Sequence, residues 1–137
     1  MSKIYLAGRY RDRERFREAR DRLERDEHVV VARWLDDLEP RGPDPTWHEG
    51  YAVKCAARDI ADILCCNMFV LDLTSLTGPE AGENRGGLYV ELGLALAVLV
   101  AGGDIAFVLI GAPTNIFTYS ARFRRYDTLD EFVQDMQ

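Results

Sequence analysis

MFVLD at residues 68–72 opens the apolar centre of this chain, and it is followed by LYVELGLALAVLVA at 88–101 and IAFVLI at 105–110. The two short runs are rich in branched and aromatic residues, as is typical of buried strands. The segment between them is long enough for a helix that is buried on most sides, and Gly102-Gly103 ends it. A strand, a helix and a second strand in this order predict a parallel βαβ unit.

The same alternation extends toward the N-terminus. KIYLA at 3–7 predicts a buried strand ended by Gly8, and 12–27 predicts an amphipathic helix. HVVVA at 28–32 predicts a second buried strand. The segment 36–46 is a loop with three prolines, and a second helix is expected over 47–66. The inner face of that second helix is expected to hold Ala52, Ala56, Ile60 and either Ile63 or Leu64.

Toward the C-terminus, 122–126 predicts an edge strand, and Thr128-x-x-Glu131 is a capping box that opens the last helix. Five strands alternating with helices predict an α/β fold whose sheet is mostly parallel, with helices on both faces. We expect a single flavodoxin-like domain over residues 1–137, with strand order 2-1-3-4-5. Ligands of such sheets bind beyond the carboxyl ends of the strands where the order reverses, which points to the segments after the first and third strands.

Composition excludes several classes of function. The 137 residues carry a net charge of -6, which argues against a general surface for nucleic-acid polymers. An anionic partner must therefore meet a local cluster of arginines. No apolar segment is long enough to span a bilayer, and Met1-Ser2 runs straight into a strand pattern without a signal peptide. Cys55 and the adjacent pair Cys65-Cys66 suit buried thiols in a reducing cytoplasm, so we expect a cytoplasmic protein.

The first candidate site follows the first strand. Gly8 permits close approach of the backbone to a ligand, and Arg9 and Arg11 bring positive charge to a place where a phosphate can sit. A tight turn followed by a solvated helix face is the alternative. The dinucleotide and P-loop motifs are absent from the sequence.

The second and third candidate sites are carboxylates on helices. Glu91 stands alone in an apolar helix, four residues after Gly87, and burial of an unpaired carboxylate is costly. It is therefore a candidate nucleophile or base, with a structural ion pair as the alternative. Asp59 shares a helical face with Asp62, and a solvated acidic face is the alternative for that pair. Trp34 and Trp47 flank the irregular loop, where they either stack on a base or pack in the core.

These segments together resemble the nucleoside 2-deoxyribosyltransferase superfamily, which includes 2'-deoxynucleoside 5'-phosphate N-hydrolases and CMP N-glycosidases. The resemblance rests on Tyr-Leu-Ala-Gly near the N-terminus, Arg-Asp in the second helix, Gly-Gly-x-x-x-Glu-Leu-Gly-x-Ala-x-Ala, and Ile-Gly-x-x-x-Asn-x-Phe after the fourth strand. It implies that Glu91 attacks C1' of a sugar, that Tyr5 positions Glu91, and that Asp59 handles the proton of the departing base. It also implies a 5'-phosphate site made by Gly8, Arg9, Arg11, Arg85, Gly86 and Gly87.

The function implied by this resemblance is hydrolysis of the N-glycosidic bond of a nucleoside or deoxynucleoside 5'-monophosphate, with a pyrimidine base somewhat favoured. Transferases of the superfamily often carry an aspartate six residues before the nucleophile, whereas this chain has Arg85, which suits a phosphate. Transfer of deoxyribose between bases and a non-catalytic nucleotide-binding module are the alternatives. No metal or organic cofactor is expected, because the nucleophile is a side chain.

We also expect a homodimer or a higher homo-oligomer with shared active sites. The helix over 88–101 is apolar on nearly every face, and a subunit interface buries such a surface. The alternative is that this helix is the central core element of a monomer. The resemblance implies that the segment 114–120 completes the site of a neighbouring subunit, with Asn115 as the contributing residue.

Overall fold

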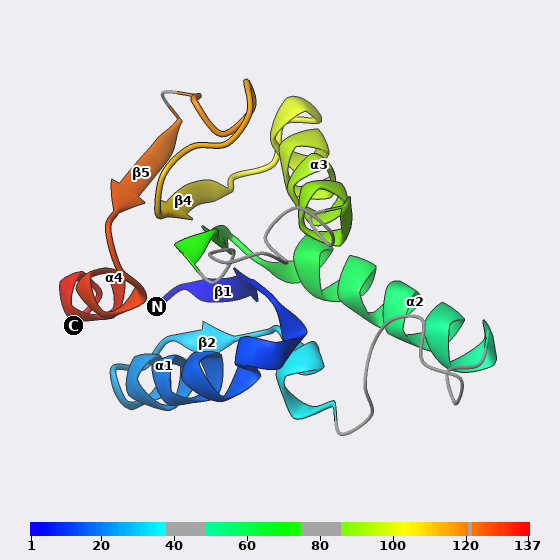
Figure 1. Cartoon of the computed structure of the whole chain (residues 1–137), viewed down its shortest axis with the longest axis horizontal. Coiled ribbons are helices and arrows are strands. Elements are labelled where there is room, and N and C mark those ends of the chain that lie inside the picture. The colour runs from blue at the N-terminus through cyan, green and yellow to red at the C-terminus, as the bar shows by residue number, and fades with distance from the viewer. Residues whose placement is uncertain (38–48, 75–85, 121) are drawn as a thin grey trace.

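The computed structural model describes residues 1–37, 49–74, 86–120 and 122–137, and its core is a five-stranded sheet (Figure 1). The strand order is β2-β1-β3-β4-β5, and each of the four pairings is parallel. The strands are β1 (Lys3–Ala7), β2 (Val29–Val30), β3 (Met68–Asp72), β4 (Ala106–Ile110) and β5 (Phe123–Tyr126). This flavodoxin-like arrangement confirms the predicted fold class and strand order.

Helices cover both faces of the sheet (Figure 1). They are α1 (Arg13–Arg25), α2 (Glu49–Cys65), α3 (Gly86–Val100) and α4 (Leu129–Asp135), with short 3-10 helices η1 (Tyr10–Asp12) and η2 (Arg33–Asp36). On one face α1 packs with α4, and on the other α2 packs with α3. In the part of the chain that the structure describes, no helix is long and apolar enough to cross a membrane.

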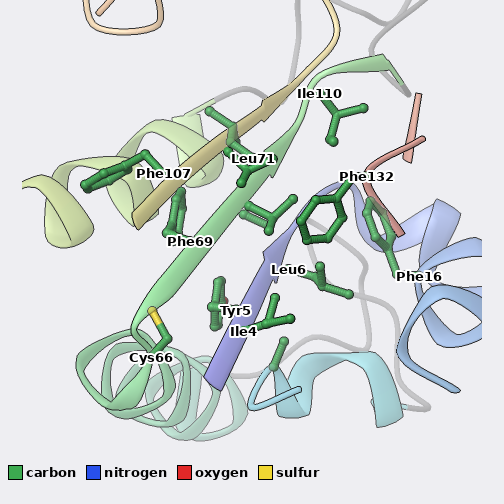
Figure 2. Packing of buried hydrophobic residues seen from close by; sticks show 14 of the residues in the cluster. Ile4, Tyr5, Leu6, Phe16, Cys66, Phe69, Leu71, Phe107, Ile110 and Phe132 are labelled. Carbon is green, nitrogen blue, oxygen red and sulfur yellow. The ribbon is translucent and has the colours of Figure 1, made fainter. Parts of the chain in front are cut away.

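A row of aromatic rings crosses the sheet from β1 to β5. Tyr5, Phe69, Phe107 and Phe123 are register partners on successive strands, and Figure 2 shows the first three among the buried core residues. The Tyr5 and Phe69 rings are parallel at 5.8 Å, and the Phe107 and Phe123 rings meet edge to face at 5.5 Å. Because Tyr5 has no exposed surface, this packing fixes the direction of its side chain.

The second strand is shorter and more exposed than expected. β2 contains only Val29 and Val30 instead of 28–32, and Val29 is 41% exposed. Its position explains the difference, because β2 is an edge strand that pairs with β1 alone. An edge strand has one neighbour to bury its side chains, so the expectation of a buried second strand was wrong.

The buried face of α2 is also different from the expected one. It consists of Cys55, Asp59, Asp62 and Ile63. Of the apolar residues that were expected inside, Ile63 is fully buried, whereas Ile60 is 41% exposed and Ala56 is exposed. Two aspartates therefore occupy the inner face, which excludes the alternative of a solvated acidic face for Asp59 and Asp62. Sequence periodicity predicts that the apolar residues lie inside because it contains no information about which acids form ion pairs in the folded protein.

The sequence predicts that α3 is buried on most sides, but in the structure it is not. Leu88, Leu92 and Ala95 form its buried stripe, whereas Val90 is 66% exposed and Val100 is 87% exposed. α3 packs against β3 and α2, and the sides of the helix that face neither element stay open to solvent. The end of the helix is as expected: the Gly103 N–H donates to the carbonyl of Val98 after Gly102 takes a φ of 92°.

Candidate active site

The site is built around a hydrogen bond between a strand and a helix. The Tyr5 hydroxyl, on β1, donates to Oε1 of Glu91, on α3, at 2.9 Å. The two residues are 86 positions apart in sequence, and the sheet brings them together as the resemblance implied. A carboxylate that accepts a hydrogen bond from a fixed hydroxyl has a defined orientation, which a nucleophile needs.

Glu91 faces a cavity of about 400 Å³ between α2 and α3. The cavity is lined by Ala52, Cys55, Ala56, Asp59, Ile60 and Ile63 of α2 and by Gly87, Val90, Glu91 and Leu94 of α3. Asp59 and Glu91 are the acids in this otherwise apolar lining. Two carboxylates in an apolar pocket of this size suit acid-base or nucleophilic chemistry on a small organic substrate.

Asp59 is 9% exposed and is paired with an arginine beside it. Its Oδ1 accepts from Nη2 of Arg58 at 3.2 Å. Arg58 also forms two hydrogen bonds with the carboxylate of Asp37, from Nη1 at 2.5 Å and from Nη2 at 2.8 Å. The hydrogen bond with Asp37 is the largest cause that raises the pKa of Arg58 above its ordinary value. Arg58 and Asp37 were not among the predicted site residues.

The turn after β1 has a structural role as well as a place near the site. A side-chain carbon on Gly8 would lie 2.1 Å from the ring of Phe16, so a glycine is required here for packing. Arg9 precedes η1 and Arg11 lies within it. Gly8 directly follows the carboxyl end of β1, and α3 follows the parallel strand β3, so this turn and the start of α3 belong to the same end of the sheet.

The start of α3 is open toward the cavity. A side-chain carbon on Gly87 would meet no atom within 4 Å, and this residue lines the cavity one helical turn before Glu91. α3 begins at Gly86, so its first N–H groups lie at this end of the helix, where they suit an anion. Arg85, the third arginine expected at the phosphate, lies outside the described residues.

Trp34 belongs to the core. It is 2% exposed, its indole N–H donates to the carbonyl of Leu6 at 2.8 Å, and its ring meets Phe16 edge to face. The buried ring has no open face for a base, so the expectation that Trp34 stacks on the substrate was wrong. Trp47, the other tryptophan considered for this role, lies outside the described residues.

Asn115 lies on the opposite side of α3 from Glu91. Its Oδ1 accepts from the N–H groups of Phe117 and Thr118 at 3.0 and 3.2 Å, which folds the segment into a turn. The residue lines a second cavity of about 220 Å³ with Tyr89 and Leu96, and it does not line the cavity of Glu91 in its own chain. Its expected contribution to a neighbouring subunit stays a prediction.

Across residues 1–37, 49–74, 86–120 and 122–137, no three His, Cys, Asp or Glu side chains gather where they could hold a metal ion.

The chain is similar over almost its whole length to a solved structure. The CMP N-glycosidase BcmB of Clostridium botulinum has a TM-score of 0.57 and 18% sequence identity, over 98% of this chain and 97% of that chain. The two proteins share a fold. No protein-family model and no curated protein matches the chain.

Proposed function

We propose that this protein hydrolyses the N-glycosidic bond of a nucleoside 5'-monophosphate, with a pyrimidine base favoured. The observation that carries the proposal is the Glu91 carboxylate, held by the Tyr5 hydroxyl at a cavity that Asp59 also lines. The fold shared with a CMP N-glycosidase and the resemblance of the motifs to the nucleoside 2-deoxyribosyltransferase superfamily support it.

In the proposed mechanism, a carboxylate oxygen of Glu91 attacks C1' and the bond from C1' to the base breaks. The base leaves with the electron pair of that bond, and Asp59, in its protonated form at this step, donates the proton that neutralises the base. A water molecule then attacks C1' of the glycosyl-enzyme and gives a proton to Asp59. The bond between C1' and Glu91 breaks in this step, and the Glu91 carboxylate is released. Two displacements at C1' yield the sugar phosphate with retained configuration, as in retaining glycosidases.

The 5'-phosphate would lie at the end of the sheet shared by the turn after β1 and the start of α3. Arg9, Arg11 and Arg85 would supply positive charge, and the first N–H groups of α3, at Gly86 and Gly87, would donate to the phosphate oxygens. The chain carries a net charge of -6, so a local cluster of this kind is what would attract an anionic substrate.

The test is incubation with a panel of nucleosides and their 5'-monophosphates, with chromatography to detect the free base. Release without an acceptor supports a hydrolase, exchange only with an added base indicates a transferase, and neither indicates a binding module. Glu91→Gln is expected to lower turnover by several orders of magnitude while the fold is kept, because it removes the nucleophile. Near-normal turnover by a folded Glu91→Gln protein would contradict the assignment of the nucleophile.

We also propose that the protein is a homo-oligomer whose active sites are completed by a neighbouring chain. The exposed side of α3 includes Val90, and the segment after β4 exposes three large apolar side chains, Ile116, Phe117 and Tyr119. Apolar surface of this kind favours association. Light scattering tests the assembly, and a mass of one chain would refute it. Mixing inactive Glu91→Gln and Asn115→Ala proteins should restore activity if sites are shared, and failure despite subunit exchange would confine each site to one chain.

A further inference from the structure

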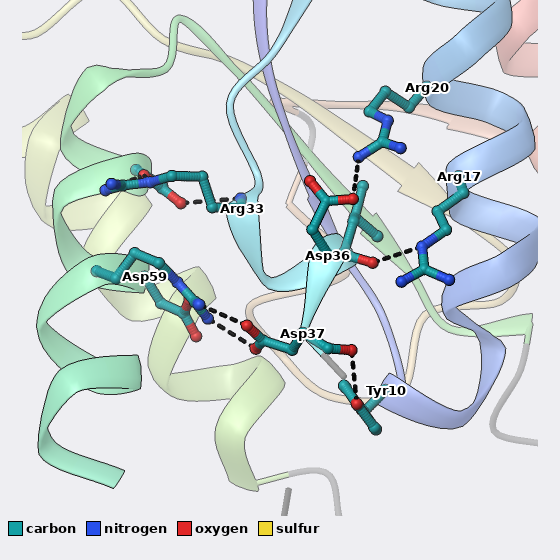
Figure 3. Close-up of polar contacts among 10 residues, drawn as sticks. Tyr10, Arg17, Arg20, Arg33, Asp36, Asp37 and Asp59 are labelled. Carbon is teal, nitrogen blue, oxygen red and sulfur yellow. Dashed lines mark hydrogen bonds and ion pairs between the residues drawn. The ribbon is translucent and has the colours of Figure 1, made fainter. Parts of the chain in front are cut away.

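Asp37 joins three separate parts of the chain near the candidate site (Figure 3). It follows η2 directly and is only 7% exposed. Its carboxylate accepts both hydrogen bonds from Arg58 of α2, and its backbone carbonyl accepts from the Tyr10 hydroxyl at 2.8 Å. Tyr10 lies between Arg9 and Arg11 in the turn after β1. A buried carboxylate with a two-pronged arginine partner is a strong and directional contact.

Arg58 carries this contact to the acid of the cavity. The guanidinium donates from Nη2 to Oδ1 of Asp59 at 3.2 Å, while Nη1 and Nη2 hold Asp37. Neighbouring positions on a helix do not face each other, so the Arg58 head would not meet Asp59 without an anchor that draws it there. Asp37 is that anchor, and in Figure 3 it points at the guanidinium beside Asp59.

We propose that Arg58 and Asp37 are positioning residues, which together hold the Asp59 carboxylate in one orientation at the wall of the cavity. The part of the test that measures turnover rests on the proposed function. In that function Asp59 acts on the departing base, so loss of its orientation lowers the rate of the chemical step more than it weakens substrate binding.

A matched control lies one helical turn further along α2. Asp62 is also a buried aspartate held by an arginine: Arg33 donates from Nε to Oδ1 at 2.7 Å and from its backbone N–H to Oδ2 at 3.0 Å. Asp62 does not line the cavity. The pair of Arg33, on η2, and Asp62, on α2, therefore has the same chemistry, and its acid lies on the same helix as Asp59 but away from the cavity.

The experiment compares Arg58→Lys, Asp37→Asn, the double variant and the control Arg33→Lys in the base-release assay with cytidine 5'-monophosphate. Lysine keeps the charge but cannot form the two-pronged contact. Each single change, at Arg58 or at Asp37, should lower kcat about tenfold or more and move KM by less than about twofold. The double variant should lose no more activity than the more severe single variant, because the two residues act as a unit. Arg33→Lys should keep kcat within about twofold of the wild type.

Three results would overturn the proposal. These are unchanged kcat in Arg58→Lys, losses that multiply in the double variant, and an equal loss of kcat in Arg33→Lys, which would show that the helix and not the acid is affected. If the wild-type protein releases no base, the proposed function fails. A crystal structure of Arg58→Lys then decides the positioning by itself: a displaced Asp59 carboxylate supports it, and an unchanged carboxylate overturns it.

Discussion

Replacement of Tyr5 by phenylalanine isolates one hydrogen bond of the candidate site. The ring is fully buried and stacked on Phe69, and phenylalanine keeps that packing, so the change removes only the hydroxyl that donates to Glu91 at 2.9 Å. A hydrogen bond to a charged group contributes about 1.5–3 kcal/mol. If that energy serves to orient the nucleophile in the transition state, kcat/KM should fall by about 10- to 160-fold.

The assay is release of free base from cytidine 5'-monophosphate, with the melting temperature measured in parallel. Tyr126→Phe is the matched control, because its hydroxyl also donates to a carboxylate, Oδ2 of Asp135 at 2.6 Å, on residues that do not line the cavity. We expect Tyr126→Phe to keep wild-type turnover. A Tyr5→Phe protein with kcat/KM within about twofold of the wild type would show that the hydroxyl does not orient the nucleophile.

Two further predictions concern the phosphate and a buried thiol. A nucleoside 5'-monophosphate should exceed its nucleoside in kcat/KM by about tenfold or more, since a charge-assisted bond from Arg9, Arg11 or Arg85 favours it; equal values would favour the nucleoside transferase instead. Burial raises the pKa of the Cys66 thiol from 9.0 to about 11, so the unfolded chain loses this proton first and stability should fall as the pH rises between those values. The melting temperature of Cys66→Ala should therefore decline less steeply over this pH range than that of the wild type. Parallel declines would show that the pKa of Cys66 is not raised in the folded protein.

The positions of the strands along the chain were predictable because the information is local. KIYLA, MFVLD and AFVLI are short apolar runs ended by glycine or a polar residue, and each forms a strand at that place. The exposure of β2 and α3 was not predictable in the same way. Val29 and Val90 are apolar, and their exposure depends on which elements stand next to them in space, which a single run of residues does not record.

The residues of the candidate site differ in the same way in how far the sequence predicts them. Glu91 was found because it is an acid in an apolar helix, and the resemblance of the motifs added Tyr5 as its partner. Arg58 and Asp37 were missed because their contact joins α2 to the end of η2 and leaves no spacing in the sequence. The sequence left two roles open for Trp34, since a tryptophan beside a loop can pack inward as readily as it can meet a ligand, and the structure buries it in the core.

The hydrogen bond between Tyr5 and Glu91 links β1 to α3, and α3 should open locally more easily than β1. β1 has a hydrogen-bonded neighbour on each side, whereas α3 buries fewer side chains, Leu88, Leu92 and Ala95, and packs its other apolar residues only in part. Amide hydrogens of β1 should consequently exchange with solvent far more slowly than those of α3. Each brief detachment of α3 separates the acid from its hydroxyl while the sheet stays intact. On warming, the carboxylate should thus lose the hydrogen bond from Tyr5 before the protein as a whole unfolds.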